Sequence, residues 1–324
     1  MRVGVAGTGY LGARHARKLA ARRDVDALLL YDREPERAAA LAAELGPRAA
    51  AHPGLDAFLA ACDAVVVAAS TEAHAELSIA ALAAGRAVLV EKPIAVSLEE
   101  ADAMVAAAAH AGRPLMVGHI ERFNPAVRKL SGRLAAPRFI EAHRLAALKP
   151  RSLDVDVVLD LMIHDIDLAL HFMRALPARI EAAGSSVLTK REDIANARLV
   201  FPGGGVANLT ASRVSLSPTR KIRFFMPERY VSIDCQVGRA DVYWLEGEEA
   251  VAPAPGGPEI TPDLMGRIRH EALEGDGEDA LDAELSAFLA AARGEAAPAV
   301  SGEDGRAALA VALQVLARLR DRDA

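Results

Sequence analysis

The sequence has few cysteines, no long uninterrupted apolar run and no excess of basic residues. Cys62 and Cys235 are its two cysteines, and they lie far apart in no metal-like spacing. A disulfide framework is therefore not expected, and a reducing compartment is favoured. Charge or glycine interrupts every apolar stretch before it reaches membrane-spanning length, and the N-terminus opens on a strand pattern without an apolar signal region. We expect a cytoplasmic protein.

The acidic balance and the length limit the function and the number of domains. A net charge of −6 argues against a general nucleic-acid binder, because neutralising phosphates requires a basic face. The 324 residues exceed what one hydrophobic core comfortably holds, so we expect two domains. Apolar residues are plentiful, although many are alanines, which favour helix but bury little area each.

Residues 1–119 alternate short apolar runs with alanine-rich helical patterns. The run Ala64–Ala69 is wholly apolar, as expected for a strand that is covered on both faces. Strands that alternate with helices at this spacing predict right-handed βαβ units and a parallel, doubly wound Rossmann sheet. The predicted strands are Val3–Ala6, Ala27–Tyr31, Ala64–Ala69, Ala87–Val90 and Leu115–Gly118, and the predicted helices are Leu11–Ala21, Pro35–Leu45, Glu72–Ala84 and one that Ser97 caps and that runs to about His110.

The rhythm changes after about Ile120, and we predict a second domain over residues 120–324. Consecutive strand patterns with tight turns predict an α+β domain with a largely antiparallel open sheet and helices on one face. Strands are predicted at Arg138–Ala146, Arg179–Val187, Asn196–Phe201, Val206–Arg213, Arg220–Met226 and Tyr230–Asp234. Helices are predicted at Pro125–Leu134, Asp154–Met173, Asp279–Ala292 and Gly302–Arg320, with a flexible connection at Ala252–Gly257.

The first predicted strand leads into a glycine-rich loop that fits G-x-G-x-x-G, namely Gly7-Thr8-Gly9-Tyr10-Leu11-Gly12. The glycines permit a tight turn, close approach to a pyrophosphate and close helix–strand packing, while the helix N-terminus offers N–H groups to the phosphates. Asp32 lies about 20 residues further on, where a carboxylate binds ribose hydroxyls and repels a 2′-phosphate. We therefore expect NAD, although Arg33 leaves NADP open because a guanidinium can hold the extra phosphate.

Two further motifs follow the glycine loop. The first, Val90-Glu91-Lys92-Pro93-Ile94-Ala95, comes at the end of a predicted parallel strand, and the second is Asp160-Leu161-Met162-Ile163-His164-Asp165. Together the three motifs resemble, in order and kind, the glucose-fructose oxidoreductase / inositol dehydrogenase / rhizopine-catabolism family. Within that family, Gly118–Pro125 followed by the Asp160 motif is similar to UDP-N-acetylglucosamine 3-dehydrogenases and their relatives.

The resemblance implies that Lys92 points toward both nicotinamide and substrate, and that Asp160 and His164 line the substrate pocket. Oxidation of a secondary alcohol releases a hydroxyl proton, which a histidine can accept near neutral pH. Asp160 precedes His164 by four residues, so both face the same side of the predicted helix and Asp160 could orient the imidazole. Lys92 could stabilise charge on the reacting oxygen. Either His164 or Lys92 could be the formal base; we favour His164. A satisfied structural pair is the alternative for Asp160 and His164.

The resemblance also implies a cofactor-binding turn at the end of the predicted strand Ala64–Ala69, formed by Ser70 and Thr71 with His74 nearby, and places Glu91 at the neighbouring strand end. Pro93 follows a cis peptide bond in many family members. The exposed sheet face of the second domain often mediates oligomer contacts, so a homodimer or homotetramer is implied. No paired ligand motif such as H-E-x-x-H is present, and we predict no metal site.

Several polar residues near the domain junction have two interpretations. Arg122 could grip a substrate diphosphate or form an interdomain salt bridge. Asn124 could bind sugar hydroxyls, but it directly precedes Pro125 and is at least as well suited to capping a helix. The basic residues Arg144, Lys149 and Arg151 could serve a substrate phosphate, although a solvated loop is the safer interpretation.

Three functions are compatible with these patterns. The leading hypothesis is NAD-dependent oxidation of a ring hydroxyl of a sugar or nucleotide sugar, with C3 of UDP-N-acetylglucosamine as its sharpest form. The second is a dehydrogenase of a free cyclic polyol or aldose, which needs no diphosphate grip. The third is a regulatory protein that binds the cofactor without catalysis. Retention of Lys92, Asp160 and His164 together argues against the third.

Overall fold

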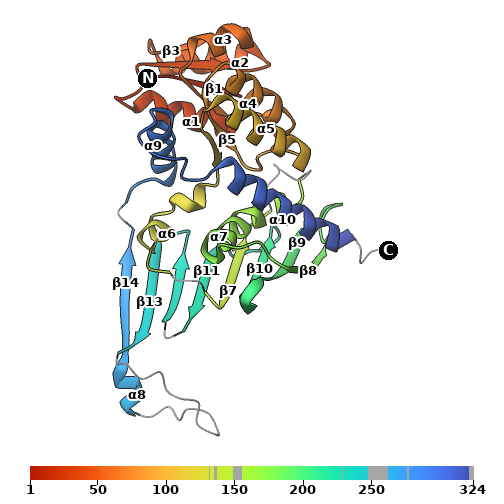
Figure 1. Ribbon diagram of the computed structural model, residues 1–324, viewed down its shortest axis with the longest axis vertical. Coiled ribbons are helices and arrows are strands. Elements are labelled where there is room, and N and C mark those ends of the chain that lie inside the picture. The colour runs from red at the N-terminus through yellow and green to blue at the C-terminus, as the bar shows by residue number, and fades with distance from the viewer. Residues whose placement is uncertain are drawn as a thin grey trace. The chain divides into compact units, whose positions relative to one another are not determined.

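The chain folds into two compact units (Figure 1). The computed structural model describes residues 1–130, 132–134, 137–148, 155–227, 229–246, 262–275 and 277–320. The first unit comprises Met1–Phe123 and Asp279–Ala310, and the second comprises Asn124–Glu278 and Val311–Ala324. The structure thus groups residues 279–310 with the first unit, whereas the sequence pattern placed them in the second domain. The predicted connection Ala252–Gly257 lies outside the described residues.

The first unit contains a six-stranded parallel sheet in the order β3-β2-β1-β4-β5-β6. This order confirms the predicted doubly wound Rossmann sheet. The strand order reverses between β1 and β4, so the carboxyl ends of these two strands mark the expected ligand crevice. The strands are β1 (Arg2–Ala6), β2 (Ala27–Tyr31), β3 (Ala49–Ala51), β4 (Ala64–Val67), β5 (Ala87–Glu91) and β6 (Leu115–Gly118).

Helices surround this sheet, and one of them comes from the far end of the sequence. Helix α9 packs against α1 and β5, which explains why residues 279–310 belong to the first unit. The Ser97 hydroxyl accepts a bond from the Glu100 N–H at 3.2 Å, which confirms the predicted cap. The elements are α1 (Tyr10–Ala21), α2 (Pro35–Leu45), α3 (Leu55–Ala61), η1 (Thr71–Ala73), α4 (His74–Ala83), α5 (Leu98–Ala111), η2 (Ile120–Phe123) and α9 (Ala280–Ala292); α10 (Gly302–Arg320) is shared by both units.

The second unit is built on an eight-stranded sheet in the order β14-β13-β12-β11-β7-β10-β9-β8. Strands β7 and β10 pair in parallel and the other neighbours pair antiparallel, which confirms the predicted largely antiparallel sheet. Helices α6 and α7 lie over one face of it (Figure 1). The strands are β7 (Phe139–Leu145), β8 (Arg179–Ser185), β9 (Ile194–Val200), β10 (Val206–Ser212), β11 (Thr219–Met226), β12 (Arg229–Asp234), β13 (Arg239–Leu245) and β14 (Ile268–Glu274).

The helix that carries the Asp160 motif differs from the predicted regular helix. A π-type segment, η3 (Val158–Met162), precedes α7 (Ile163–Met173), so the two helix types meet between Asp160 and His164. Such π segments often occur at functional sites. The remaining elements of this unit are α6 (Pro125–Leu130), η4 (Pro202–Gly204) and α8 (Pro262–Arg267).

A buried ion pair fixes α7 to the sheet. From β7, Arg144 donates from Nε and Nη2 to the two carboxylate oxygens of Asp165, at 3.0 and 2.8 Å. Both side chains are about 5% exposed (4% and 5%). Arg144 is therefore neither a solvated loop residue nor placed to hold a substrate phosphate. Lys149 and Arg151, grouped with it in the sequence, lie outside the described residues.

The two cysteines and the lengths of the helices agree with what the sequence predicts. Cys62 and Cys235 are both buried, and no disulfide joins them, in agreement with the sequence prediction. Burial raises the pKa of Cys62 to about 12, so this thiol stays protonated at neutral pH. Across the described ranges, every helix is too short or too polar to cross a bilayer.

Replacing Asp165 with Asn should lower the free energy of unfolding by about 3–5 kcal/mol, because the Arg144 guanidinium would stay buried without its carboxylate. Urea unfolding measures this loss. Asp102→Asn, which removes the exposed Arg306–Asp102 pair, is the matched control and should leave the midpoint close to that of the unmodified protein. Equal effects of the two substitutions would contradict a structural role for the buried pair.

Candidate functional site

The glycine loop after β1 has the geometry of a phosphate cradle. Gly7 adopts φ +91°, and a Cβ there would lie 2.5 Å from the Ala69 nitrogen, after β4. A Cβ on Gly12 would lie 1.8 Å from the Gly7 carbonyl oxygen, whereas one on Gly9 would meet no atom within 4 Å. Gly9 is the N-cap residue of α1, and among the described residues no side chain caps this helix end. The loop thus leaves open space in front of helix N–H groups, which fits the pyrophosphate of a dinucleotide.

Asp32, at the end of β2, is fixed by hydrogen bonds to the same loop. Its Oδ2 accepts from the backbone N–H and hydroxyl of Thr8 at 2.6 and 2.8 Å, and its Oδ1 accepts from the Glu34 N–H at 3.0 Å. Burial acts to raise the pKa of Asp32, but the bonds from Glu34 and Thr8 outweigh it and hold the pKa below its ordinary value. The carboxylate is therefore ionised and oriented, while Arg33 beside it is exposed.

The turn after β4 combines exposed and buried polar residues. Ser70 is exposed and Thr71 is partly exposed, so both are accessible to a ligand. His74 is 1% exposed; its Nδ1 lies 3.0 Å from the Pro93 carbonyl oxygen and its Nε2 3.2 Å from that of Ala69. Burial lowers the pKa of His74 although both carbonyls oppose this. The structure therefore makes His74 a link between two site loops, since its ring does not reach the surface.

The end of β5 carries the predicted catalytic lysine. Lys92 is partly exposed, and its peptide bond to Pro93 is cis, as the family resemblance implies. The Lys92 N–H donates to Oε2 of Glu91 at 3.2 Å. The other oxygen of Glu91, Oε1, lies 2.7 Å from Nε2 of His15 on α1. The Glu91 carboxylate thus lies between the His15 ring and the backbone N–H of Lys92 and contacts both.

Sequence reasoning missed two residues beside Glu91. His15 and Glu284 are 1% and 0% exposed, and one ligand-type atom of each lies within 4.8 Å of one on the other and on Glu91. His15 follows Gly12 by three residues on the inner face of α1, and Glu284 is a carboxylate within an apolar stretch of α9. In the sequence, only the position of Glu284 among leucines and alanines indicates a buried acid. Its partners lie far away along the chain and could not be inferred.

Arg122 and Asn124 each have a partner that the sequence could not identify. Arg122, on η2, lies 3.7 Å from the Asp304 carboxylate, within the same unit, and its side chain is 8% exposed. Asn124 donates to the Cys235 carbonyl at 2.8 Å and accepts from the Ala126 N–H at 3.1 Å. The structure therefore supports the capping interpretation of Asn124 at the start of α6.

The second unit carries the other predicted catalytic pair. Asp160 lies in η3 and His164 in the first turn of α7, and both are partly exposed. Four residues are close to one turn in either helix type, so the two side chains leave the helix on the same side. The predicted residues therefore fall into two sets, one with Lys92 in the first unit and one with His164 in the second.

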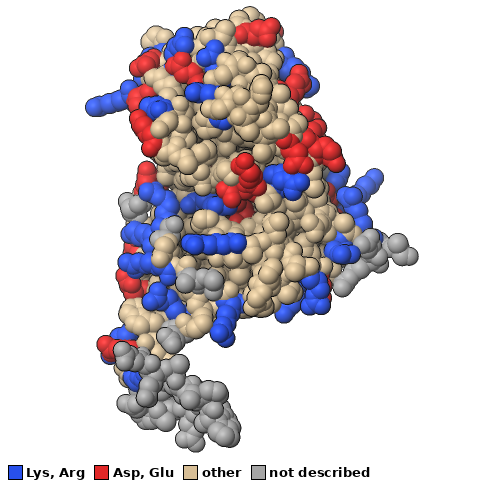
Figure 2. Space-filling model, in the orientation of Figure 1, with Lys and Arg blue, Asp and Glu red and all other residues tan. Residues whose placement is uncertain are grey.

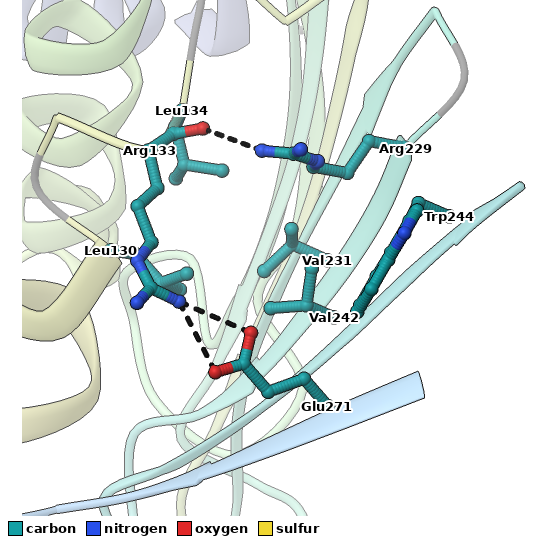
Figure 3. A pocket seen from close by; sticks show the side chains of 8 residues that line it. All are labelled: Leu130, Arg133, Leu134, Arg229, Val231, Val242, Trp244 and Glu271. Atoms are coloured by element: carbon teal, nitrogen blue, oxygen red, sulfur yellow. Dashed lines mark hydrogen bonds and ion pairs between the residues drawn. The ribbon is translucent and has the colours of Figure 1, made fainter. Parts of the chain in front are cut away.

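A separate pocket of about 220 Å³ lies between the region after α6 and strands β12–β14 (Figure 3). Apolar side chains form its floor, and Arg133 bonds to Glu271 at 3.2 Å across its opening. Its lining residues are Leu130, Arg133, Leu134, Arg229, Val231, Val242, Trp244 and Glu271. None of the predicted site residues is among them. On the face in Figure 2, Lys and Arg side chains lie among acidic and uncharged residues.

Comparison with known proteins identifies the family. Residues 1–119 match the model of an oxidoreductase family with an NAD-binding Rossmann fold, and residues 127–236 match the GFO/IDH/MocA C-terminal domain. The chain belongs to this family. The family assigned from the three motifs is thereby confirmed, and the protein is an oxidoreductase with an NAD-binding Rossmann domain.

Several members of this family resemble the chain over nearly its whole length. UDP-N-acetylglucosamine 3-dehydrogenase of Acidithiobacillus ferrooxidans is 41% identical over 316 residues, 97% of this chain and 96% of that protein. Its crystal structure superimposes with a TM-score of 0.88 at 40% identity, covering 98% of this chain and 97% of that one. Inositol 2-dehydrogenase of Rhizobium meliloti is 28% identical, over 96% of this chain and 94% of that protein. The fold alone is shared with scyllo-inositol dehydrogenase of Lactobacillus casei, solved with NAD(H) and scyllo-inositol (TM-score 0.78, 19% identity, 99% and 97% coverage).

From the surroundings of Gly9 and Gly12, we expect alanine to affect NAD binding at the first position and stability at the second. Gly9→Ala should leave the melting temperature unchanged, because its methyl group meets no protein atom, yet it should weaken NAD binding about tenfold or more by occupying the pyrophosphate approach. Gly12→Ala should destabilise the fold itself, because its methyl group collides with the Gly7 carbonyl. Calorimetric titration with NAD and thermal unfolding separate the two effects. Unchanged NAD affinity in Gly9→Ala would refute the cradle.

Proposed function

We propose that the protein oxidises a ring hydroxyl of a nucleotide sugar with NAD, and that C3 of UDP-N-acetylglucosamine is the reacting position. The observation that carries the proposal is 41% identity, over 97% of the chain, to an enzyme named for that reaction. The chain also retains the lysine at the end of β5 and the Asp160–His164 pair. A free cyclic polyol is the second candidate, supported by the inositol 2-dehydrogenases at lower identity.

The proposed chemistry divides between cofactor and protein. NAD, when bound, supplies the hydride acceptor. The loop at Gly9 and the carboxylate of Asp32 would hold its pyrophosphate and ribose. His164 takes the hydroxyl proton, with Asp160 orienting the imidazole and supporting its charged form. The Lys92 ammonium donates a hydrogen bond to the reacting oxygen and stabilises negative charge that develops there.

The substrate proposal is tested by following NADH formation with UDP-N-acetylglucosamine, free N-acetylglucosamine and myo-inositol at equal concentrations. We expect turnover with the nucleotide sugar and at least about tenfold lower kcat/KM with the other two, because the nucleotide supplies binding energy that they lack. Turnover with myo-inositol alone would replace the proposal with the polyol reaction. NAD binding without turnover of any sugar would support the regulatory alternative.

Replacing His164 with Ala should lower kcat about a hundredfold or more, because the hydroxyl proton would lose its acceptor. Steady-state kinetics with NAD and UDP-N-acetylglucosamine measure the loss, and titration with NAD is the control. The affinity for NAD should stay nearly unchanged, since the cofactor loop lies in the other unit. Collapse of NAD binding together with turnover would show that the histidine is structural.

Replacing Asp32 with Ala should weaken the preference for NAD over NADP by about tenfold or more, because the ionised carboxylate repels a 2′-phosphate. The ratio of kcat/KM for the two cofactors is the measurement. Asp32→Asn is the matched variant, since it keeps the shape and removes the charge. An unchanged ratio in both variants would show that Asp32 only holds the loop through Thr8 and Glu34 and does not select the cofactor.

A further inference from the structure

Three side chains from distant parts of the sequence form a buried cluster beneath Lys92. His15 comes from α1, Glu91 from the end of β5 and Glu284 from α9, and one nitrogen or oxygen of each lies within 4.8 Å of the others. The contact between His15 Nε2 and Glu91 Oε1 is 2.7 Å. Across the described part of the chain, neither carboxylate oxygen of the fully buried Glu284 has a hydrogen-bond partner.

The cluster can hold one negative charge more easily than two. Burial acts to raise the pKa of Glu91, but the bond and charge of His15 and the charge of Lys92 outweigh it and keep the pKa low. Burial and the charge of Glu91 raise the pKa of Glu284 well above its ordinary value. An ionised carboxylate with no partner, beside a second one, would be strongly destabilised in this interior. Burial without a hydrogen-bond partner among the described residues, beside a second carboxylate, therefore favours the protonated form of Glu284.

A metal ion explains this cluster less well than a proton does. Two carboxylates and an imidazole are suitable ligand types. However, His15 Nε2 already bonds to Glu91, and its Nδ1 has no partner among the described residues. A metal-bound imidazole normally donates a hydrogen bond from its other nitrogen, which fixes the ring. The geometry therefore favours a proton on Glu284 over a bound metal ion.

We propose that Glu284 is a positioning residue for Lys92: as a neutral acid, it leaves Glu91 as the single negative charge shared by His15 and the Lys92 N–H. This inference rests on the proposed function, because that function gives Lys92 its role. Loss of the Glu284 proton at alkaline pH would place two carboxylates side by side. Their repulsion would weaken the hold of Glu91 on the Lys92 backbone and lower turnover.

Other charged groups near the cluster have separate partners. On α1, Lys18 bonds to Asp282 at 2.7 Å, and Arg22 bonds to Asp24 and Ser286. On η2, Arg122 pairs with Asp304. The charged groups on the elements packed against α9 are His15, Arg14, Arg17, Lys18, Glu91, Glu121 and Arg122. Among them, the charge of Glu91 raises the pKa of Glu284.

The first test measures stability and needs no substrate. The folded-state pKa of Glu284 lies above its unfolded value, so the unmodified protein loses stability as pH rises from about 4.5 toward that folded pKa. Glu284→Gln keeps the shape and does not titrate. The folding equilibrium constant of this variant, relative to the unmodified protein, should therefore rise about tenfold per pH unit over that interval. Urea unfolding between pH 5 and about pH 8 measures this ratio, with the exposed Glu99→Gln as control.

The second test is the pH profile of kcat. The unmodified enzyme should lose activity at alkaline pH, and Glu284→Gln should keep it, so that the activity ratio of variant to parent rises about threefold or more. Glu99→Gln should follow the parent. Superimposable profiles for Glu284→Gln and parent would overturn the positioning role, and a pH-independent stability ratio would overturn the buried proton. Absence of turnover in the parent would instead reject the proposed function, while the stability test still decides on the proton.

Discussion

The dinucleotide loop depends on close backbone contact between two parallel strands. Gly7 leaves β1 at φ +91° with its Cα against Ala69, and Gly12 sits against the Gly7 carbonyl, so neither position has room for a side chain. This packing places the N-terminus of α1 at the reversal of strand order, between β1 and β4. Gly7 and Gly12 allow the start of α1 to pack closely against the ends of β1 and β4, and Gly9 then faces open space. The steric demand thus leaves the N–H groups at the start of α1 open to an anion, with no charged side chain in the loop.

Three acidic residues of the first unit differ in the hydrogen bonds that their carboxyl groups accept. Asp32 stays ionised because backbone N–H groups and the Thr8 hydroxyl bond to it. Glu91 stays ionised because His15 bonds to it. No such donor reaches Glu284 among the described residues, and burial beside Glu91 raises the pKa of its carboxyl group. Donors oriented by the fold, more than burial itself, therefore decide which carboxylates are charged beside the glycine loop and Lys92.

Regular apolar patterns made most of the fold predictable. Predicted and observed bounds coincide for β2, α2, β6 and α10. Strand β3 was missed because three alanines carry no period, and β14 because its residues are mostly exposed and alternate charge with apolar side chains weakly. Local motifs likewise led to the predictions for the glycine loop, Asp32, Lys92 and His164. The cap formed by Asn124, the Arg144–Asp165 pair and the cluster at Glu91 depend on residues that only the tertiary fold brings together, so no spacing in the sequence reveals them.

Residues 279–310 belong to the first unit and bring a second carboxyl group close to Glu91 at the end of β5. Helix α9 contributes Glu284 to the interior beside Glu91 and His15, although it lies far from both in the sequence. Glu284 can join His15 and Glu91 only after residues 124–278 of the second unit have been synthesised. If Glu284 serves only to fill space, an apolar residue of the same size would be more stable there than an acid that must hold a proton. A carboxyl group at this position is therefore better explained by its effect on the charge of Glu91 than by packing.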